Sequence, residues 1–513
     1  MKNPVKIVIF LAIAGVFVAG AEYLDQTPAG QKFNQTVFLE MLCGNTEGVG
    51  QAEVTYVGFT DGYRVLDEDP WPPSRLDWDV ILNRLGPGTQ ADREAAEAAK
   101  KAQEEAAAKS EGDPEAETAI PDHRKDFHDA PVVGIVPSLN WRHDPADNDD
   151  VLARKAMKDI SLRLRSLVVG TTLGPKGSGG AQDIDPAALR LIERVEGDIS
   201  KVPEAEAVVE APDEALVYAG VAAFNQIELS DAVESTVDGI RIPVLARVGE
   251  QLLAGFPLQV ILEKEHLGPE NVSVRFGTEN GNVIEIFRED QDGEQTDEIV
   301  HSIPVDDRGR LLVFGGVRVG ELYPKLDAVG DLILYSSDYD VAEDVSRTDP
   351  EVIKTLGKNA VVIGFDTEDN RQFELPGGDK VSRAELMAMA VATVQSGRFI
   401  TLWPDWMRYS AIGGVALLGC LLIPTRAVSK AGIFISLLIL VGYVALTLVT
   451  FQSNLSWTPP LAGIGVCLAL VITGFLIPKS SGKTPTTPED ETKDASPEPE
   501  KKDATKDEAA TAA

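Results

Sequence analysis

The side chains in this sequence that are best suited to chemistry are its five histidines and a few groups of acidic residues. His123 and His128 stand close to Asp126 and Asp129, but a zinc site needs four ligands at a recognisable spacing, which this group lacks. A second acidic group suggests calcium, yet it does not follow the twelve-residue calcium-loop pattern. Its members are Asp290, Asp292, Glu294, Asp297 and Glu298. We interpret both groups as solvated loops, and we predict no metal site and no cofactor.

Motifs for catalysis are also missing from the sequence. It contains no nucleophile elbow, no H-E-x-x-H and no dinucleotide-binding glycine pattern. The glycine-rich segment 171–186 lacks the lysine-serine ending of a phosphate-binding loop. A Ser/His/Asp triad can be assembled from residues far apart in the chain, but nothing here points to one. We predict a protein that is not an enzyme, with no catalytic residue to name.

Four residues are candidates for ligand binding. Asp61, Arg75 and Asp366 lie at the expected ends of strands, the side on which open α/β sheets bind their ligands. Trp71 stands among Pro70, Pro72 and Pro73, and an aromatic residue there can line a ligand cleft. The alternative, which we favour for Trp71, is a rigid turn that covers the end of the sheet.

Short apolar segments that alternate with amphipathic ones must position these residues. An α/β domain with a mostly parallel sheet is expected from this alternation. A second group of segments has the turn signals of antiparallel strands and predicts a small β-rich subregion. The expected parallel strands are 52–60, 130–138, 165–172, 215–224 and 358–366, the helices begin near 78, 151 and 382, and the antiparallel strands are 271–277, 282–289, 298–306 and 309–316.

Long apolar runs near both ends of the chain predict membrane helices. The run 431–451 is uncharged and long enough to cross about 30 Å of hydrocarbon. The flanking runs 409–424 and 460–478 are richer in glycine, which lets neighbouring helices approach closely. Residues 5–21 form either a retained anchor, which we favour, or a signal peptide cleaved after Ala19-Gly20-Ala21.

The basic residues near these runs predict the orientation, because Lys and Arg concentrate on the cytoplasmic side. With the N-terminus inside, three basic pairs fall in the cytoplasm, and only Arg408 lies on the outer side of a span. The pairs are Lys2 with Lys6, Arg426 with Lys430, and Lys479 with Lys483. We therefore expect a multi-pass protein of the cytoplasmic membrane with its large domain outside.

Composition divides the chain into four parts. We expect an anchor or signal at 1–23, an extracytoplasmic domain at 24–405 with a charged insertion at 88–121, three membrane helices at 406–478, and a disordered cytoplasmic tail at 479–513. A net charge of -34 excludes nucleic acid as a partner. Cys43 is the only cysteine of the polar body, so the body forms no internal disulfide.

Several segments together resemble the type-two CHASE domain, an extracellular sensor module of bacterial cyclases and histidine kinases. The resemblance spans about 36–400 and the three runs that follow. It is carried by Asp61 with the Trp-Pro turn 70–75, VDGIRIPVLARVGEQLLAGFPLQVIL (237–262), IPVDDRGRLLVFGG (303–316), Leu356-Gly357-Lys358 before AVVIGFD, and SGRFI (396–400). The chain departs from the family at Pro137-Ser138, where an Asp is common, and at Met387-Ala388, where a His-Ala pair is common.

This resemblance implies an outside sensor domain held by one N-terminal and three C-terminal membrane helices. The tail is too short and too polar to hold a kinase or cyclase, so a signal would have to pass to a separate kinase or cyclase partner. We therefore expect a sensory or ligand-binding protein that recognises a small molecule and signals through its spans. The alternative is a cell-envelope scaffold that docks protein partners, and an envelope hydrolase is the least favoured hypothesis.

Overall fold

The largest sheet of the protein is mostly parallel, as the sequence predicts. The computed structural model describes residues 3–34, 52–62, 73–85, 131–141, 148–176, 182–184, 190–218, 220–228, 233–236, 239–278, 281–288, 298–313, 323–328, 356, 359–375, 379–426 and 430–476. Its main sheet contains parallel strands in the order β17-β1-β18-β2-β3-β8. β7 pairs antiparallel with the end of β3, and β4 pairs antiparallel with β7. These strands are β17 (Lys325–Asp327), β1 (Val54–Phe59), β18 (Ala360–Phe365), β2 (Val132–Ile135), β3 (Ser166–Gly174), β8 (Val221–Ile227), β7 (Ala207–Glu210) and β4 (Gln182–Asp183).

Helices cover both faces of this sheet, which explains why its strands are buried on both sides. One face packs against α5 (Arg75–Arg84), α7 (Asn148–Arg163) and α8 (Glu214–Val217), and the fully buried Trp78 belongs to this cluster. The other face packs against α9 (Phe256–Glu265) and α12 (Arg383–Ser396). The side chains alternate along β1, with Val57 on the first face and Tyr56 on the second. The main sheet is therefore the middle layer of three.

The expected strand 215–224 is wrong in its first half. Residues Glu214–Val217 form the short helix α8, and the strand begins only at Val221. Asp213 is the cause, because its carboxylate accepts a hydrogen bond from Ala215 N at 2.8 Å and caps the first turn of the helix.

A smaller set of antiparallel sheets forms a subregion beside the main sheet. One sheet has the order β15-β14-β13-β6, and two others have the orders β16-β10-β9 and β11-β12-β5. The expected strand 309–316 corresponds to β16, which pairs antiparallel with β10 in the second of these sheets. The bounds are β5 (Leu191–Ile192), β6 (Arg194–Glu196), β9 (Glu234–Thr236), β10 (Gly239–Pro243), β11 (Leu245–Val248), β12 (Gln251–Ala254), β13 (Val272–Thr278), β14 (Gly281–Arg288), β15 (Glu298–Val305) and β16 (Arg310–Val313).

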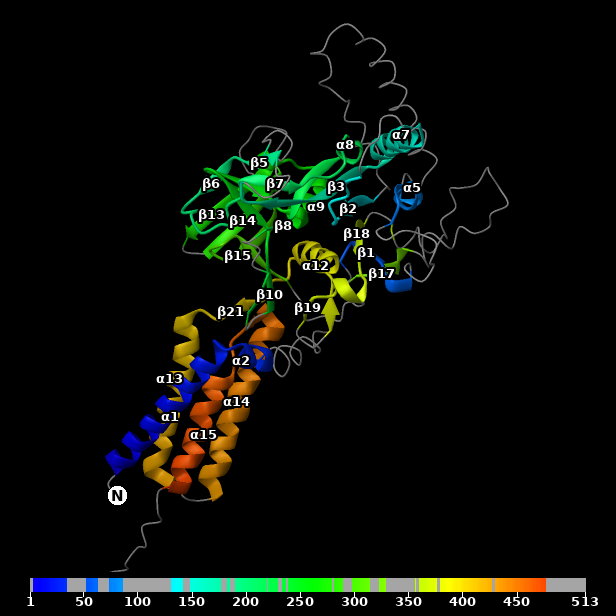
Figure 1. Cartoon of the computed structure of the whole chain (residues 1–513). Coiled ribbons are helices and arrows are strands. Elements are labelled where there is room, and N and C mark those ends of the chain that lie inside the picture. The colour runs from blue at the N-terminus through cyan, green and yellow to red at the C-terminus, as the bar shows by residue number, and fades with distance from the viewer. Residues whose placement is uncertain are drawn as a thin grey trace, which may run out of the picture.

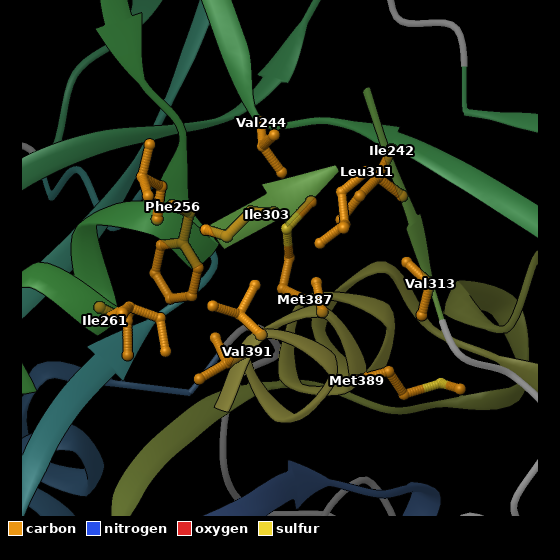
Figure 2. Packing of buried hydrophobic residues seen from close by; sticks show 14 of the residues in the cluster. Ile242, Val244, Phe256, Ile261, Ile303, Leu311, Val313, Met387, Met389 and Val391 are labelled. Atoms are coloured by element: carbon orange, nitrogen blue, oxygen red, sulfur yellow. The ribbon is translucent and has the colours of Figure 1, made fainter. Parts of the chain in front are cut away.

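Helix α12 is the central helix of the body. Every residue from Ala384 to Val394 is buried, because the helix contacts the main sheet on one side and β15, β16 and α9 on the others. Figure 2 shows Met387 and Val391 of this helix pointing toward Ile303, Leu311 and Phe256. A helix that is apolar all round belongs in a core, so α12 links the two sheet systems.

Four long helices form a bundle below the body (Figure 1). They are α1 (Asn3–Asp25), α13 (Asp405–Arg426), α14 (Lys430–Asn454) and α15 (Leu461–Leu476), and a short helix α2 (Pro28–Phe33) follows α1. Helix α15 contacts all three other long helices. In α1 and α14, the segments Pro4–Asp25 and Phe434–Phe451 are long and apolar enough to cross a membrane, and Leu461–Thr473 in α15 is a shorter apolar segment.

The body joins the bundle through two short strands. β21 (Thr401–Leu402), which precedes α13, pairs in parallel with β22 (Ser456–Trp457), which lies between α14 and α15. A further hairpin, β19 (Phe373–Glu374) with β20 (Lys380–Val381), precedes α12. Several expected features lie outside the described residues: Cys43, the Trp-Pro turn, the insertion 88–121, the histidines His123 and His128, most of the acidic group near 290, and the tail 479–513.

Candidate functional site

The carboxyl end of β18 is the point at which the main sheet changes direction. β18 lies between β1 and β2. The chain after β1 and β2 leads to helices on one face, whereas the chain after β18 leads to α12 on the other. Open α/β sheets bind ligands at such switch points. Asp366 directly follows β18, and Asp61 follows β1 by two residues. Two of the candidates predicted from the sequence therefore lie at this edge of the sheet.

Asp366 is the centre of a buried ionic network. Its side chain is fully buried and accepts two hydrogen bonds from Arg371, Nε to Oδ1 at 3.0 Å and Nη2 to Oδ2 at 3.0 Å. Lys325 Nζ lies 2.8 Å from Oδ2. The side chains of Lys325 and Arg371 are 31% and 35% exposed, so the carboxylate lies inside and its two cationic partners reach solvent.

Glu385 is the second buried carboxylate of this network. Its Oε2 lies 2.9 Å from Lys325 Nζ, so one ammonium bridges two acids. Burial raises the pKa of Glu385, and the Lys325 charge opposes this rise. Glu385 stands in the first turn of α12, where its backbone N–H donates to the Oγ of the N-cap Ser382 at 3.1 Å. The sheet and the start of α12 are thus held together by Lys325.

Two tyrosines lie on the buried side of this ionic network. The Tyr56 hydroxyl lies 3.1 Å from Ser382 Oγ, and the Lys325 ammonium lies 5.4 Å from the centre of the Tyr56 ring. Tyr323 is fully buried, and its hydroxyl has no hydrogen-bond partner among the described residues. Burial, reinforced by Glu385, raises the pKa of Tyr323 well above its usual range, so the hydroxyl stays protonated. We call the following residues the switch-point cluster: Tyr56, Tyr323, Lys325, Asp366, Arg371, Ser382 and Glu385.

The other expected site residues have different places. Asp61 Oδ2 accepts a hydrogen bond from Glu368 N at 2.9 Å, so Asp61 fixes the turn that follows Asp366. Arg75 instead lies on the helix-covered face opposite α12, where it pairs with Asp150 of α7 and with Asp213 at 3.5 Å. It also lies 5.4 Å from the Trp141 ring centre. Arg75 shares none of these partners with Asp366, and Trp71 lies outside the described residues.

Sequence reasoning missed most of the cluster. The only local signal is the Ser-x-x-Glu pattern at Ser382 and Glu385, which marks a helix start because the glutamate ordinarily reaches back to the N-cap. Here the Glu385 carboxylate contacts Lys325 instead. Lys325 begins the three-residue edge strand β17, and Tyr323 lies two residues before it. Both are far from Asp366 in the chain, and no sequence pattern marks them.

Comparison with protein-family models, curated proteins and solved structures found no match for this chain. Among the described residues, no group of three or more His, Cys, Asp or Glu side chains is arranged to hold a metal ion. The switch-point cluster therefore has to be interpreted from its own geometry, which offers two buried carboxylates, two cations that are 31% and 35% exposed, and three buried hydroxyls.

Proposed function

We propose that the chain is a multi-pass membrane protein whose body lies outside the cytoplasm, binds a small molecule at the switch-point cluster and passes its state to the bundle. One observation carries the proposal. A single helix, α12, begins at the cluster with Ser382 and Glu385, and the chain after it runs through β21 directly into α13. Figure 1 shows this path from α12 past β21 into the bundle.

The exposed surface of the bundle supports a membrane location. Large apolar side chains point outward along α13 and α14, whereas contiguous patches of this kind are rare on soluble monomers. They include Leu417, Leu421, Phe434, Leu438 and Val441, all more than half exposed. Because all polar backbone groups of a helix bond within it, a four-helix bundle suits hydrocarbon. The basic pairs near the ends of the runs favour the cytoplasm for the end of the bundle far from the body.

The packing of α1 favours a retained anchor over a cleaved signal peptide. Phe10 is fully buried, and its ring leaves no room for a side chain at Gly419. At the outer end of the bundle, Arg408 Nη2 lies 2.8 Å from Glu22 Oε1 and 3.3 Å from Asp25 Oδ2. This pairing also accounts for Arg408, which the orientation rule leaves on the outer side of α13.

The joint between body and bundle is packed as a core. Phe451, near the end of α14, and Trp457 of β22 are fully buried and belong to the same hydrophobic cluster as α12. Trp403 N donates to Trp457 O at 2.8 Å, and Thr401 N donates to Leu455 O at 3.0 Å. Because close-packed interiors transmit displacement instead of absorbing it, a shift of α12 is expected to reach α13 and α14 together.

The proposal is tested by perturbing the cluster and observing the joint. In the full chain in lipid nanodiscs, Glu385→Gln removes one charge at the start of α12. We expect faster amide hydrogen exchange in 401–409 and 451–460, neither of which adjoins Glu385 in the chain, because coupling requires a two-state element that both ends bias. The control is Glu368→Gln, a nearby exposed glutamate. Unchanged exchange at the joint would contradict signalling through α12, and an enzyme reporter fused near residue 300 that is active only in the cytosol would contradict the orientation.

One observation favours the scaffold as a second candidate. The cations and carboxylates of the cluster already pair with each other. A purely structural role, in which the network fixes the loop after β18, is therefore sufficient to explain these contacts. In that case, crosslinking in cells would capture stable protein partners through the body, and no small molecule would raise the melting temperature of the purified protein.

A further inference from the structure

The ammonium group of Lys325 occupies a cation site that is built mainly from other parts of the chain. Asp366 and Glu385 approach it at 2.8 and 2.9 Å, and the Tyr56 ring lies 5.4 Å away. Two buried carboxylates and an aromatic face are the groups that stabilise a desolvated ammonium. Lys325 itself comes from β17, a three-residue strand that, among the described strands, pairs with β1 alone.

One polar group of this site is left unsatisfied by Lys325. The buried Tyr323 hydroxyl has no partner among the described residues, although it lies close enough to Glu385 and Asp366 for their charges to act on it. An unmade hydrogen bond of this kind costs about 1–3 kcal/mol. An ammonium has three N–H donors, and that of Lys325 is shown bonded to two carboxylates, with its position limited by the backbone of β17.

The local charge favours a cationic ligand over an anionic one. Segments 60–61, 325–327, 366–371 and 382–385 together hold six carboxylates and three basic side chains, so they carry three negative charges in excess. An anion approaching Lys325 and Arg371 would meet this excess. A metal ion would have to displace Lys325 while remaining near Arg371, which already uses both oxygens of Asp366.

We propose that the ligand of the switch-point cluster carries a primary ammonium group that replaces Lys325 between Asp366 and Glu385. This inference rests on the proposed function, in which the cluster binds a small molecule. A ligand ammonium is not tied to β17, so it can contact both carboxylates and also donate to Tyr323. Lys325, which is 31% exposed, leaves for solvent, and the edge strand is released from the start of α12.

Chemical rescue tests the site. In the full chain in nanodiscs, Lys325→Ala removes the internal ammonium and is expected to lower the melting temperature, whereas Lys380→Ala, which changes an exposed lysine of β20, leaves it unchanged. Millimolar n-butylamine should then restore at least half of the loss in the Lys325→Ala protein. n-Butanol, which has the same chain without the charge, should restore none of it. Equal effects of amine and alcohol, or no effect of either, would overturn the ammonium site.

The unmodified protein provides the second measurement, which holds even where Lys325→Ala does not fold. 1,4-Diaminobutane should raise its melting temperature in a saturable way and speed exchange in 325–327, and Asp366→Asn should abolish both effects. An increase that never saturates, or that persists in Asp366→Asn, refutes the inference. A neutral or anionic compound that stabilises the protein through Asp366 would refute the ammonium class while leaving the proposed function intact. Unchanged hydrogen exchange in 401–409 and 451–460 after Glu385→Gln would refute the proposed function, regardless of the results with amines.

Discussion

Replacing Asp366 by asparagine should destabilise the body more than any other isosteric change at the switch-point cluster. The substitution keeps the shape of the side chain and removes its charge. It weakens three contacts, two from Arg371 at 3.0 Å and one from Lys325 at 2.8 Å. The asparagine amide can no longer accept two parallel hydrogen bonds from the Arg371 guanidinium, because one of its two ends is now a donor.

The size of the effect follows from burial. Breaking a buried ion pair by removing one partner costs about 3–5 kcal/mol, because the other charge is left unpaired out of water. Here the remaining cations are about one third exposed, so water can compensate them in part, and Glu385 still pairs with Lys325. We therefore expect about 2–3 kcal/mol, below the range for a fully buried pair.

The assay is a thermal melt of the full chain in nanodiscs, followed by tryptophan fluorescence and by hydrogen exchange of 360–366 and 382–394. At roughly 2–4 °C per kcal/mol for a domain of 150–250 residues, a loss of about 2–3 kcal/mol corresponds to a shift of about 4–12 °C, and the larger size of this body favours the lower end. The control is Asp369→Asn, an exposed aspartate in the same loop, which should stay within about 0.5 kcal/mol of the unmodified protein. Equal shifts for both variants would show that the network contributes no net stability and would refute the reasoning.

Four further predictions concern the joint, the bundle, the sheet and pH. Arg408→Gln should loosen α1 from α13 by about 2 kcal/mol, seen as faster proteolysis of the N-terminal segment, because Glu22 and Asp25 lose a charged donor. Phe451→Ala should cost about 3–5 kcal/mol and broaden the melt into two steps as body and bundle uncouple. Gly364→Ala should cost about 1–3 kcal/mol in the same melt, because its new methyl would overlap the Cβ of Ala384 in α12. Because burial raises the pKa of Glu385 above its ordinary 4.5, the folded state holds this proton more tightly, so stability should fall as pH rises from 4.5 through the raised pKa, and Glu385→Gln should lack this slope in a pH series of melts.

The sequence predicted the main sheet well because buried parallel strands carry a strong signal. The strands β1, β2, β3 and β18 and the helix α12 lie within or close to the expected segments. The error at α8 has a local cause, since an apolar run cannot show that Asp213 caps its first turn. The pairing of β16 with β10 was beyond prediction for another reason, because register between distant strands depends on tertiary packing.

The site could be predicted only where a residue follows a strong strand. Asp366 could be chosen as a candidate because β18 ends immediately before it. Asp61 could be chosen because it follows the end of β1 by two residues. Arg75 also lies near that edge, but its side chain turns to the opposite face, toward α7 and α8, and sequence position does not reveal the face. Lys325 was missed because a three-residue edge strand has too few residues to show a period.

Helix α12 is the element through which, in the proposed function, the switch-point cluster acts on the bundle. Its residues Ala384–Val394 have no solvent face, so the helix cannot rotate or shift without repacking the sheet, α9 and the antiparallel strands around it. A charge change at Glu385 therefore cannot be relaxed locally by exposing the helix to water. The chain after α12 continues through Gly397, which has a left-handed φ of 62°, and into β21, which pairs with β22 in the α14–α15 connection. In the proposed function, the dense packing that stabilises the body is also what lets a ligand at the start of α12 act on the bundle.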